Sequence, residues 1–271
     1  MQPFDIPAAA VSAPCVEYRA SVSNACVRTL PEETPVAFVY DGSTEAVMMA
    51  TPGDLEDFAL GFSLTEGLIE SPSEVKELTV LHSESGIELR MWLAGARATS
   101  YRTRRRRLTG PTGCGLCGIE SLAEALKPTR VVGVGRHWQA ADVAVAVAAL
   151  AEQQTLHRKT HATHAAAFIG HGNGVAIVRE DVGRHNALDK LAGAIARSDV
   201  DANQGALVIT SRVSVEMVQK AAAIGAPLLI AVSAPTALAV RTAEAANITL
   251  IGVARQSDWE MYTHGSRIHL T

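Results

Sequence analysis

The stretch that decides the fold is residues 206–253, which run ALVITSRVSVEMVQKAAAIGAPLLIAVSAPTALAVRTAEAANITLIGV. Short apolar runs alternate there with longer segments whose apolar residues recur at helical spacing. We therefore predict strands at Ala206–Thr210, Leu228–Val232 and Ile248–Val253, separated by helices at Val213–Ile224 and Thr236–Ala246. This alternation is typical of βαβ crossovers, which build a parallel sheet covered by helices on both faces.

The segment before this stretch extends the same unit. His164–Gly170 and Val175–Arg179 flank His171-Gly172-Asn173-Gly174, which is typical of a β-hairpin. An Ala-rich helix is expected before the hairpin, at Ala140–Gln154, and another after it, at Asn186–Arg197. The predicted fold class is therefore α/β, with a C-terminal domain over residues 139–271 that is built on a parallel or mixed sheet.

The N-terminal part has a different pattern. Val36–Tyr40 and Glu45–Ala50 flank an Asp41-Gly42 turn and predict a second hairpin. A helix capped by Thr51-Pro52-Gly53-Asp54 and running to Leu64 follows, and then strands at Val75–His82 and Ile87–Leu93. We predict a smaller α+β subdomain over residues 31–108, with a loose segment before it, residues 1–30, and a cysteine loop and connection after it, residues 109–138.

Composition excludes several classes of protein. With 48% hydrophobic and 19% charged residues, the 271-residue chain is expected to be packed, and its net charge of −4 gives no overall footprint for nucleic acid. The N-terminus lacks the positive and apolar regions of a secretory signal, and the longest uncharged stretch, Ala221–Val240, contains glycine and prolines that argue against a membrane span. We therefore expect a cytoplasmic protein without a membrane partner. Its thiols are expected to be reduced, so Cys15 and Cys26 should pack as ordinary small residues rather than form a disulfide.

The predicted sheet also suggests where a ligand would bind. In open α/β sheets ligands bind beyond the carboxyl ends of the strands, so the loops 180–185, 211–212, 233–236 and 254–258 should meet at one edge. These loops carry guanidinium groups, hydroxyls and helix N-termini, all of which can donate hydrogen bonds to a phosphate group. The candidate phosphate-binding residues are Arg184, His185, Ser211, Arg212, Ser233 and Arg255. Glu180, Asp181 and Asp258 are candidates for the hydroxyls or base edge of a nucleotide. The alternative is that these residues are helix caps and solvated arginines.

Three histidines need separate consideration. His157, His161 and His164 are spaced by four and three residues, but the strand expected from Ala165 ends the helix near His161, which argues against a metal site. His164, at the start of that strand, is either a ligand contact or a core histidine. A zinc nucleobase deaminase would need a glutamate two residues after such a histidine, and Ala166 stands there, so deamination is disfavoured.

The pair Cys114-Gly115-Leu116-Cys117 lies among glycines and follows the arginine run of residues 102–107. Cationic neighbours lower the pKa of a thiol, so a mobile thiolate that carries a group is the favoured interpretation. Structural zinc, dithiol redox chemistry and inert cysteines remain open. Zinc is less favoured, because such a site needs about four ligands and the chain has no second Cys-x-x-Cys.

Several motifs together resemble those of the FdhD family of sulfur carriers for formate dehydrogenase, from about Thr34 to the C-terminus. They are TGCGLCG at 112–118, GDLED at 53–57 with LTEG at 64–67, THAAA at 163–167, REDVGRHNALDK at 179–190, TSR at 210–212 and SAPT at 233–236. The resemblance implies that Cys114, with Cys117 as its neighbour, accepts sulfane sulfur from a cysteine desulfurase as a persulfide. It also implies transfer of that sulfur to the bis-molybdopterin guanine dinucleotide molybdenum cofactor before the cofactor enters formate dehydrogenase.

The family's cofactor-binding loop corresponds to Val253, Ala254, Arg255, Gln256, Ser257 and Asp258, and the family's C-terminal fold is similar to that of cytidine deaminases without their zinc. The expected partners are thus a cysteine desulfurase, formate dehydrogenase and the molybdenum cofactor, with no nucleic acid and no resident metal. A homodimer is the commonest soluble assembly. The alternative function is a cofactor-binding chaperone whose cysteines are passive.

Overall fold

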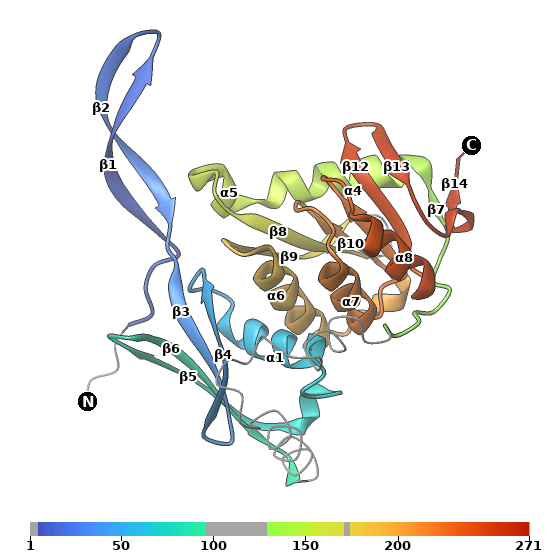
Figure 1. Cartoon of the computed structure of the whole chain (residues 1–271), viewed down its shortest axis with the longest axis horizontal. Coiled ribbons are helices and arrows are strands. Elements are labelled where there is room, and N and C mark those ends of the chain that lie inside the picture. Colours follow the sequence, from blue (N-terminus) through green and yellow to red (C-terminus); the bar gives the residue numbers. More distant parts are fainter. Residues whose placement is uncertain (1–4, 96–128, 171–173, 271) are drawn as a thin grey trace.

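The computed structural model describes residues 5–95, 129–170 and 174–270 (Figure 1). Within these ranges the chain forms a mixed α/β fold with two main sheets, one in each half. The N-terminal sheet is coloured blue to cyan in Figure 1 and the C-terminal sheet yellow to red.

The C-terminal sheet has the strand order β13-β12-β11-β10-β8-β9. Its strands are β8 (His164–Ile169), β9 (Val175–Asp181), β10 (Ala206–Ile209), β11 (Leu228–Ala231), β12 (Thr249–Arg255) and β13 (Asp258–Met261). Strands β10, β11 and β12 are mutually parallel, whereas β8 is antiparallel to both β10 and β9, and β13 is antiparallel to β12. The prediction of a mixed sheet is therefore confirmed.

Helices cover both faces of this sheet because its strands are apolar on both sides. Leu207 and Ile209 of β10 pack against α6 (Arg184–Ala196), α7 (Val215–Ile224) and α8 (Ala237–Ala245). Ala206 and Val208 of the same strand pack on the other side, against α4 (Ala140–Gln153). The short helix α5 (Thr155–Thr160) follows α4. The stretch 221–240 is the end of α7, β11 and the start of α8, and no helix in the described ranges has the length and hydrophobicity of a membrane span.

The N-terminal sheet has the order β4-β3-β6-β5. Its strands are β3 (Thr34–Tyr40), β4 (Ser43–Ala50), β5 (Val75–Ser83) and β6 (Gly86–Leu93). Helix α1 (Leu55–Thr65) packs on it through Phe58 and Phe62, whose rings contact Phe38 of β3. The expected helix cap is wrong in one detail: Asp54 makes no capping hydrogen bond, and its carboxylate instead lies 3.4 Å from the guanidinium of Arg179.

Short elements complete the described chain. Strand β7 (Trp138–Gln139) pairs in parallel with β14 (Ile268–His269), so the start of the C-terminal half is tied to its end. Single turns of 3-10 helix lie at η1 (Pro72–Glu74), η2 (Ala202–Gln204) and η3 (Gly265–Arg267).

The two halves meet where α1 crosses α6. A Cβ atom added at Gly61 would lie 1.7 Å from the carbonyl oxygen of Asp189, and one added at Gly193 would lie 1.9 Å from that of Asp57. The helix backbones are thus in direct contact. The Asp57 carboxylate reinforces the crossing by accepting hydrogen bonds from the guanidinium groups of Arg179 (2.6 Å and 2.9 Å) and Arg197 (2.9 Å).

The expectation of a loose segment over residues 1–30 is wrong for most of its length. Strands β1 (Ala10–Arg19) and β2 (Val22–Pro31) form a long hairpin whose tip extends away from the rest of the molecule (Figure 1), while β2 contacts α5. The expectation for its cysteines is also wrong, because Cys15 and Cys26 lie opposite each other and form a disulfide, with Cα atoms 5.1 Å apart. A two-stranded sheet has little core, so a cross-link of this kind supplies stability that packing does not.

Candidate functional site

The strand directions bring the predicted loops to one edge of the C-terminal sheet. Strands β9, β10, β11 and β12 all end there, and β8 and β13 begin there. The expected edge is thus present, with His164 at the start of β8 next to the ends of β9 and β10.

A cavity of about 640 Å³ lies at this edge, on the face of the sheet that α4 covers. This volume is within the range of small-molecule sites, roughly 300–1,000 Å³. Apolar side chains from α4 and from the residue after β11 line part of it: Val147, Leu150, Ala151 and Val232. The polar groups around them lie in or next to α5, the start of β8 and the ends of β10 and β12: His157, His161, Thr163, His164, Thr210 and Arg255. The cavity therefore combines an apolar surface with hydrogen-bonding groups, as small-molecule sites commonly do.

The structure brings only some of the sequence-predicted residues to this cavity. His164, Ala254 and Arg255 line it. The other described candidates do not: Arg184, His185, Ser211, Arg212, Ser233, Val253, Gln256, Ser257 and Asp258. Cys114 and Cys117 lie outside the described residues. Of the lining residues that sequence reasoning missed, His157 and His161 had a signal in the sequence, but their spacing was considered only as evidence for a metal site.

The turn of the predicted cofactor-binding loop is conformationally strained. Val253 has a φ of 52° beside a β-bulge in β12, and Gln256, at the tip before β13, has a φ of 53°. The left-handed region is unfavourable for a β-branched residue, and strain of this kind concentrates at functional sites. Here it accompanies the bulge that leads the chain to Ala254 and Arg255, both of which line the cavity.

We expect Val253→Asn to raise the free energy of unfolding by about 1 kcal/mol, because asparagine tolerates the left-handed region. Urea denaturation of the purified variant measures the change. Val47→Asn is the matched control, because Val47 is 60% exposed in strand β4 and has no positive φ. An equal response of the two variants would show that Val253 is not strained.

His164 is the best-defined polar group of the cavity. Burial lowers its pKa from the usual histidine value, and the positive charge of Arg184 lowers the pKa further, although Asp181 opposes the shift. Its Nδ1 lies 3.5 Å from the hydroxyl of Thr210. His164 is therefore predominantly neutral at neutral pH and gains a proton as the pH falls or when an anion binds.

Two predicted ligand residues are instead used within the protein. The Glu180 carboxylate accepts hydrogen bonds from the backbone N–H groups of Leu156 and His157, both at 2.7 Å, and so fixes the start of α5. Asp181 is completely buried, 2.6 Å from the ammonium of Lys190, and accepts the backbone N–H of Thr51 at 3.0 Å. The prediction that Asp181 binds nucleotide hydroxyls or a base edge is therefore wrong, whereas that for Glu180 stays a prediction.

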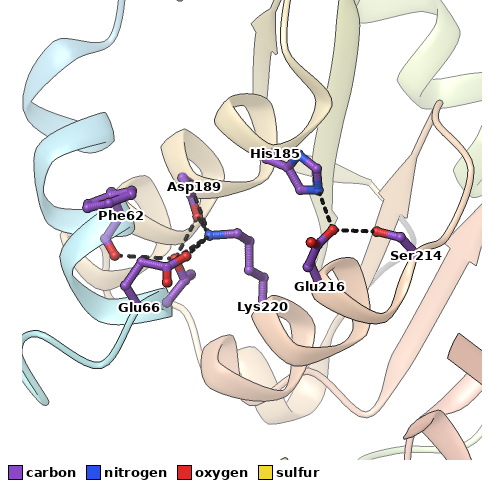
Figure 2. Close-up of polar contacts among 8 residues, drawn as sticks. Phe62, Glu66, His185, Asp189, Ser214, Glu216 and Lys220 are labelled. Atoms are coloured by element: carbon purple, nitrogen blue, oxygen red, sulfur yellow. Dashed lines mark hydrogen bonds and ion pairs between the residues drawn. The ribbon is translucent and has the colours of Figure 1, made fainter. Parts of the chain in front are cut away.

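His185 contacts α7 and not the cavity (Figure 2). Its Nε2 lies 3.1 Å from the Glu216 carboxylate, which also accepts a hydrogen bond from Ser214 at 3.1 Å. Burial and the charge of Arg184 lower the pKa of His185, while Glu216 partly offsets them. The neighbouring cluster in Figure 2 joins Lys220 to Asp189 and Glu66, each at 2.8 Å, and ties α7 to α6 and to the end of α1.

Within residues 5–95, 129–170 and 174–270, no three His, Cys, Asp or Glu side chains are placed to hold a metal ion.

The chain is thus a mixed α/β protein with a cavity at one edge of its C-terminal sheet. The model of the FdhD/NarQ family matches residues 31–269, and the chain therefore belongs to this family, as the motifs predicted. It is 51% identical over 244 residues to the sulfur carrier protein FdhD of Agrobacterium fabrum, with 90% of each chain covered. It is 52% identical to that of Brucella abortus, covering 89% of this chain and 90% of the relative.

A solved structure has the same fold. It is that of a candidate formate dehydrogenase accessory protein from Desulfotalea psychrophila, which is similar to this chain with a TM-score of 0.76 and 22% identity. The likeness covers 96% of this chain and 99% of the other.

Proposed function

We propose that this protein is a sulfur carrier that serves formate dehydrogenase. Cys114 accepts sulfane sulfur from a cysteine desulfurase as a persulfide, and the sulfur then passes to the bis-molybdopterin guanine dinucleotide molybdenum cofactor before that cofactor enters the enzyme. The observation that carries the proposal is the identity of about half of all aligned positions to proteins named sulfur carrier protein FdhD, over nearly the whole of both chains. Cys114 and Cys117 are both present in this sequence.

The loading step needs no external oxidant. The thiolate of Cys114 attacks the terminal sulfur of the desulfurase persulfide, a new sulfur–sulfur bond forms on Cys114, and the bond within the donor breaks to release the donor's thiolate. The sulfane sulfur keeps its oxidation state. The arginines at positions 102 and 104–107 favour the thiolate form of Cys114 by their positive charge.

The cavity at the sheet edge suits the nucleotide part of the cofactor. Its apolar side, with Leu150 and Val232, provides a surface for a purine base, and the guanidinium of Arg255 provides forked donors for phosphate. Anchoring the nucleotide there leaves the metal-bearing part of the cofactor free to meet the persulfide. A cytidine-deaminase-like fold, a cytoplasmic location and a homodimer belong to the same proposal and stay predictions.

Sulfur loading tests the proposal directly. After incubation with a cysteine desulfurase and cysteine, mass spectrometry should find an addition of about 32 Da on the peptide that contains Cys114. Cys114→Ala should abolish both this addition and the maturation of formate dehydrogenase. Cys15→Ser combined with Cys26→Ser is the control that keeps loading, because these cysteines lie in the β1–β2 hairpin.

Three outcomes would contradict this proposal. Sulfur found on another residue would move the carrier site, and loss of loading in Cys117→Ala alone would make Cys117 the acceptor. Full maturation by Cys114→Ala would favour the cofactor-binding chaperone, in which the cysteines are passive.

A further inference from the structure

Three histidines and one arginine surround the cavity at the sheet edge. His157 belongs to α5, His161 follows that helix, His164 begins β8, and Arg255 ends β12. Among the described residues that line the cavity there is no aspartate or glutamate. Every ionisable group of the described lining is therefore either cationic or able to become so, which is the composition of an anion site.

The position of His157 is fixed by hydrogen bonds. Its Nδ1 lies 2.9 Å from the carbonyl oxygen of Thr163, which can only accept, so Nδ1 carries a proton. The remaining Nε2 accepts a hydrogen bond when the ring is neutral and donates one when the ring is charged. Glu180 holds the helix that carries this ring, since it accepts the backbone N–H of His157 at 2.7 Å.

His161 occupies an unusual backbone position. It ends α5 with a φ of 57°, a conformation that glycine or asparagine adopts more easily. Its ring lies 5.8 Å from that of His157, in an edge-to-face arrangement. The imidazole of His161 therefore lines the cavity although the backbone conformation at this position favours glycine or asparagine.

The charges around His164 come from several elements. Arg184 and His185 of α6 and His157 of α5 disfavour its protonation, and the carboxylate of Asp181 at the end of β9 favours it. Around His157 the nearest fixed carboxylate is that of Glu180. Burial and these positive charges together lower the pKa of His164, so its ring is mostly neutral at neutral pH. A bound phosphate supplies the negative charge that favours the protonated ring.

We propose that His157, His161 and His164, together with Arg255, bind the phosphate groups of the nucleotide, and that proton uptake by His164 accompanies binding. The inference rests on the proposed function and specifies which residues hold the diphosphate and how pH regulates them. Affinity for a nucleoside diphosphate then rises as the pH falls, because acidification supplies the protonated form that binds.

Calorimetric titration of the full chain with guanosine diphosphate and with guanosine, at pH 7.8 and pH 6.2, tests this. We expect affinity for the diphosphate to rise about fivefold at the lower pH, with proton uptake visible as a dependence of the heat on the buffer used. The terminal phosphate itself loses charge near pH 6, which weakens binding, so a rise must come from the protein. Guanosine should bind more weakly and without a pH effect.

His161→Asn removes one imidazole at a backbone position that suits asparagine, so the fold is kept. It should reduce the affinity for the diphosphate at pH 6.2. His137→Asn is the matched control, because His137 stacks on His269 and does not line the cavity. It should leave this affinity unchanged.

The outcomes distinguish a failure of the histidine roles from a failure of the nucleotide site. Binding of the diphosphate that does not vary with pH, or that His161→Asn leaves intact, would overturn the role of the histidines and leave the nucleotide site standing. Guanosine binding as tightly as the diphosphate would overturn phosphate recognition. Absence of binding at both pH values would overturn the nucleotide site itself.

Discussion

Lys190→Met is expected to lower the free energy of unfolding by about 3–5 kcal/mol. The ammonium of Lys190 and the carboxylate of Asp181 are both completely buried and lie 2.6 Å apart. Lys190 also donates a hydrogen bond to the carbonyl oxygen of Thr51 at 2.8 Å, across the boundary between the halves. Methionine has a similar volume but leaves the Asp181 carboxylate buried without its cation, and that unpaired charge is the main cost.

Urea denaturation followed by circular dichroism measures this loss. Lys76→Met, on the exposed side of β5, is the control and should change stability by less than about 0.5 kcal/mol. The double variant Asp181→Asn with Lys190→Met should recover part of the loss, because neither charge is then left alone. A single variant that loses less than about 1 kcal/mol would show that the pair is dispensable.

Gly193→Ala is expected to destabilise the protein by about 3 kcal/mol or to prevent its folding. In an ordinary helix this change stabilises by up to about 1 kcal/mol, since alanine is the better helix former. At this crossing the added Cβ would lie 1.9 Å from the Asp57 carbonyl oxygen, which belongs to the backbone of α1 and cannot turn aside. Helices α1 and α6 must therefore separate, and the packing between the halves is lost.

Thermal denaturation and the soluble yield of the variant report this effect. Gly53→Ala is the matched control, because no atom lies within 4 Å of a Cβ built there and its φ is not positive. It should have the stability of the parent chain to within about 0.5 kcal/mol. A Gly193→Ala variant as stable as the parent would contradict the close contact.

The regular parts of the fold were predictable because their pattern is local. Strand β11 and helix α7 came within two residues of their predicted bounds, since apolar runs and a Gly225 C-cap mark them in the sequence. A helix that ends near His161 was expected and is present as α5, but its separate start at Thr155 was not predicted, because Glu180, which follows much later in the chain, holds that start. The β1–β2 hairpin was missed because its strands are mostly exposed and lack a buried face.

The sequence predicted which edge of the sheet carries the candidate site, but not which residues line the cavity there. Topology alone places the ends of β9 to β12 together, which located the edge near His164 and Arg255. The role of Asp181 depends on its contacts with Thr51 and Lys190, which no local sequence pattern reveals. Asp181 was therefore predicted to bind a ligand, although it stabilises the contact between the two halves of the protein.

The crossing of α1 and α6 also limits how this fold can be recombined. Residues 31–95 cannot be moved into another protein as an independent unit, because helix α1 contacts the backbone of α6 directly at Gly61 and Gly193. A chimera that exchanges the N-terminal half with a relative must bring a matching α6 with it. A cut in the chain between the two sheets would leave two fragments, each with an uncovered helix surface that only the other fragment fits.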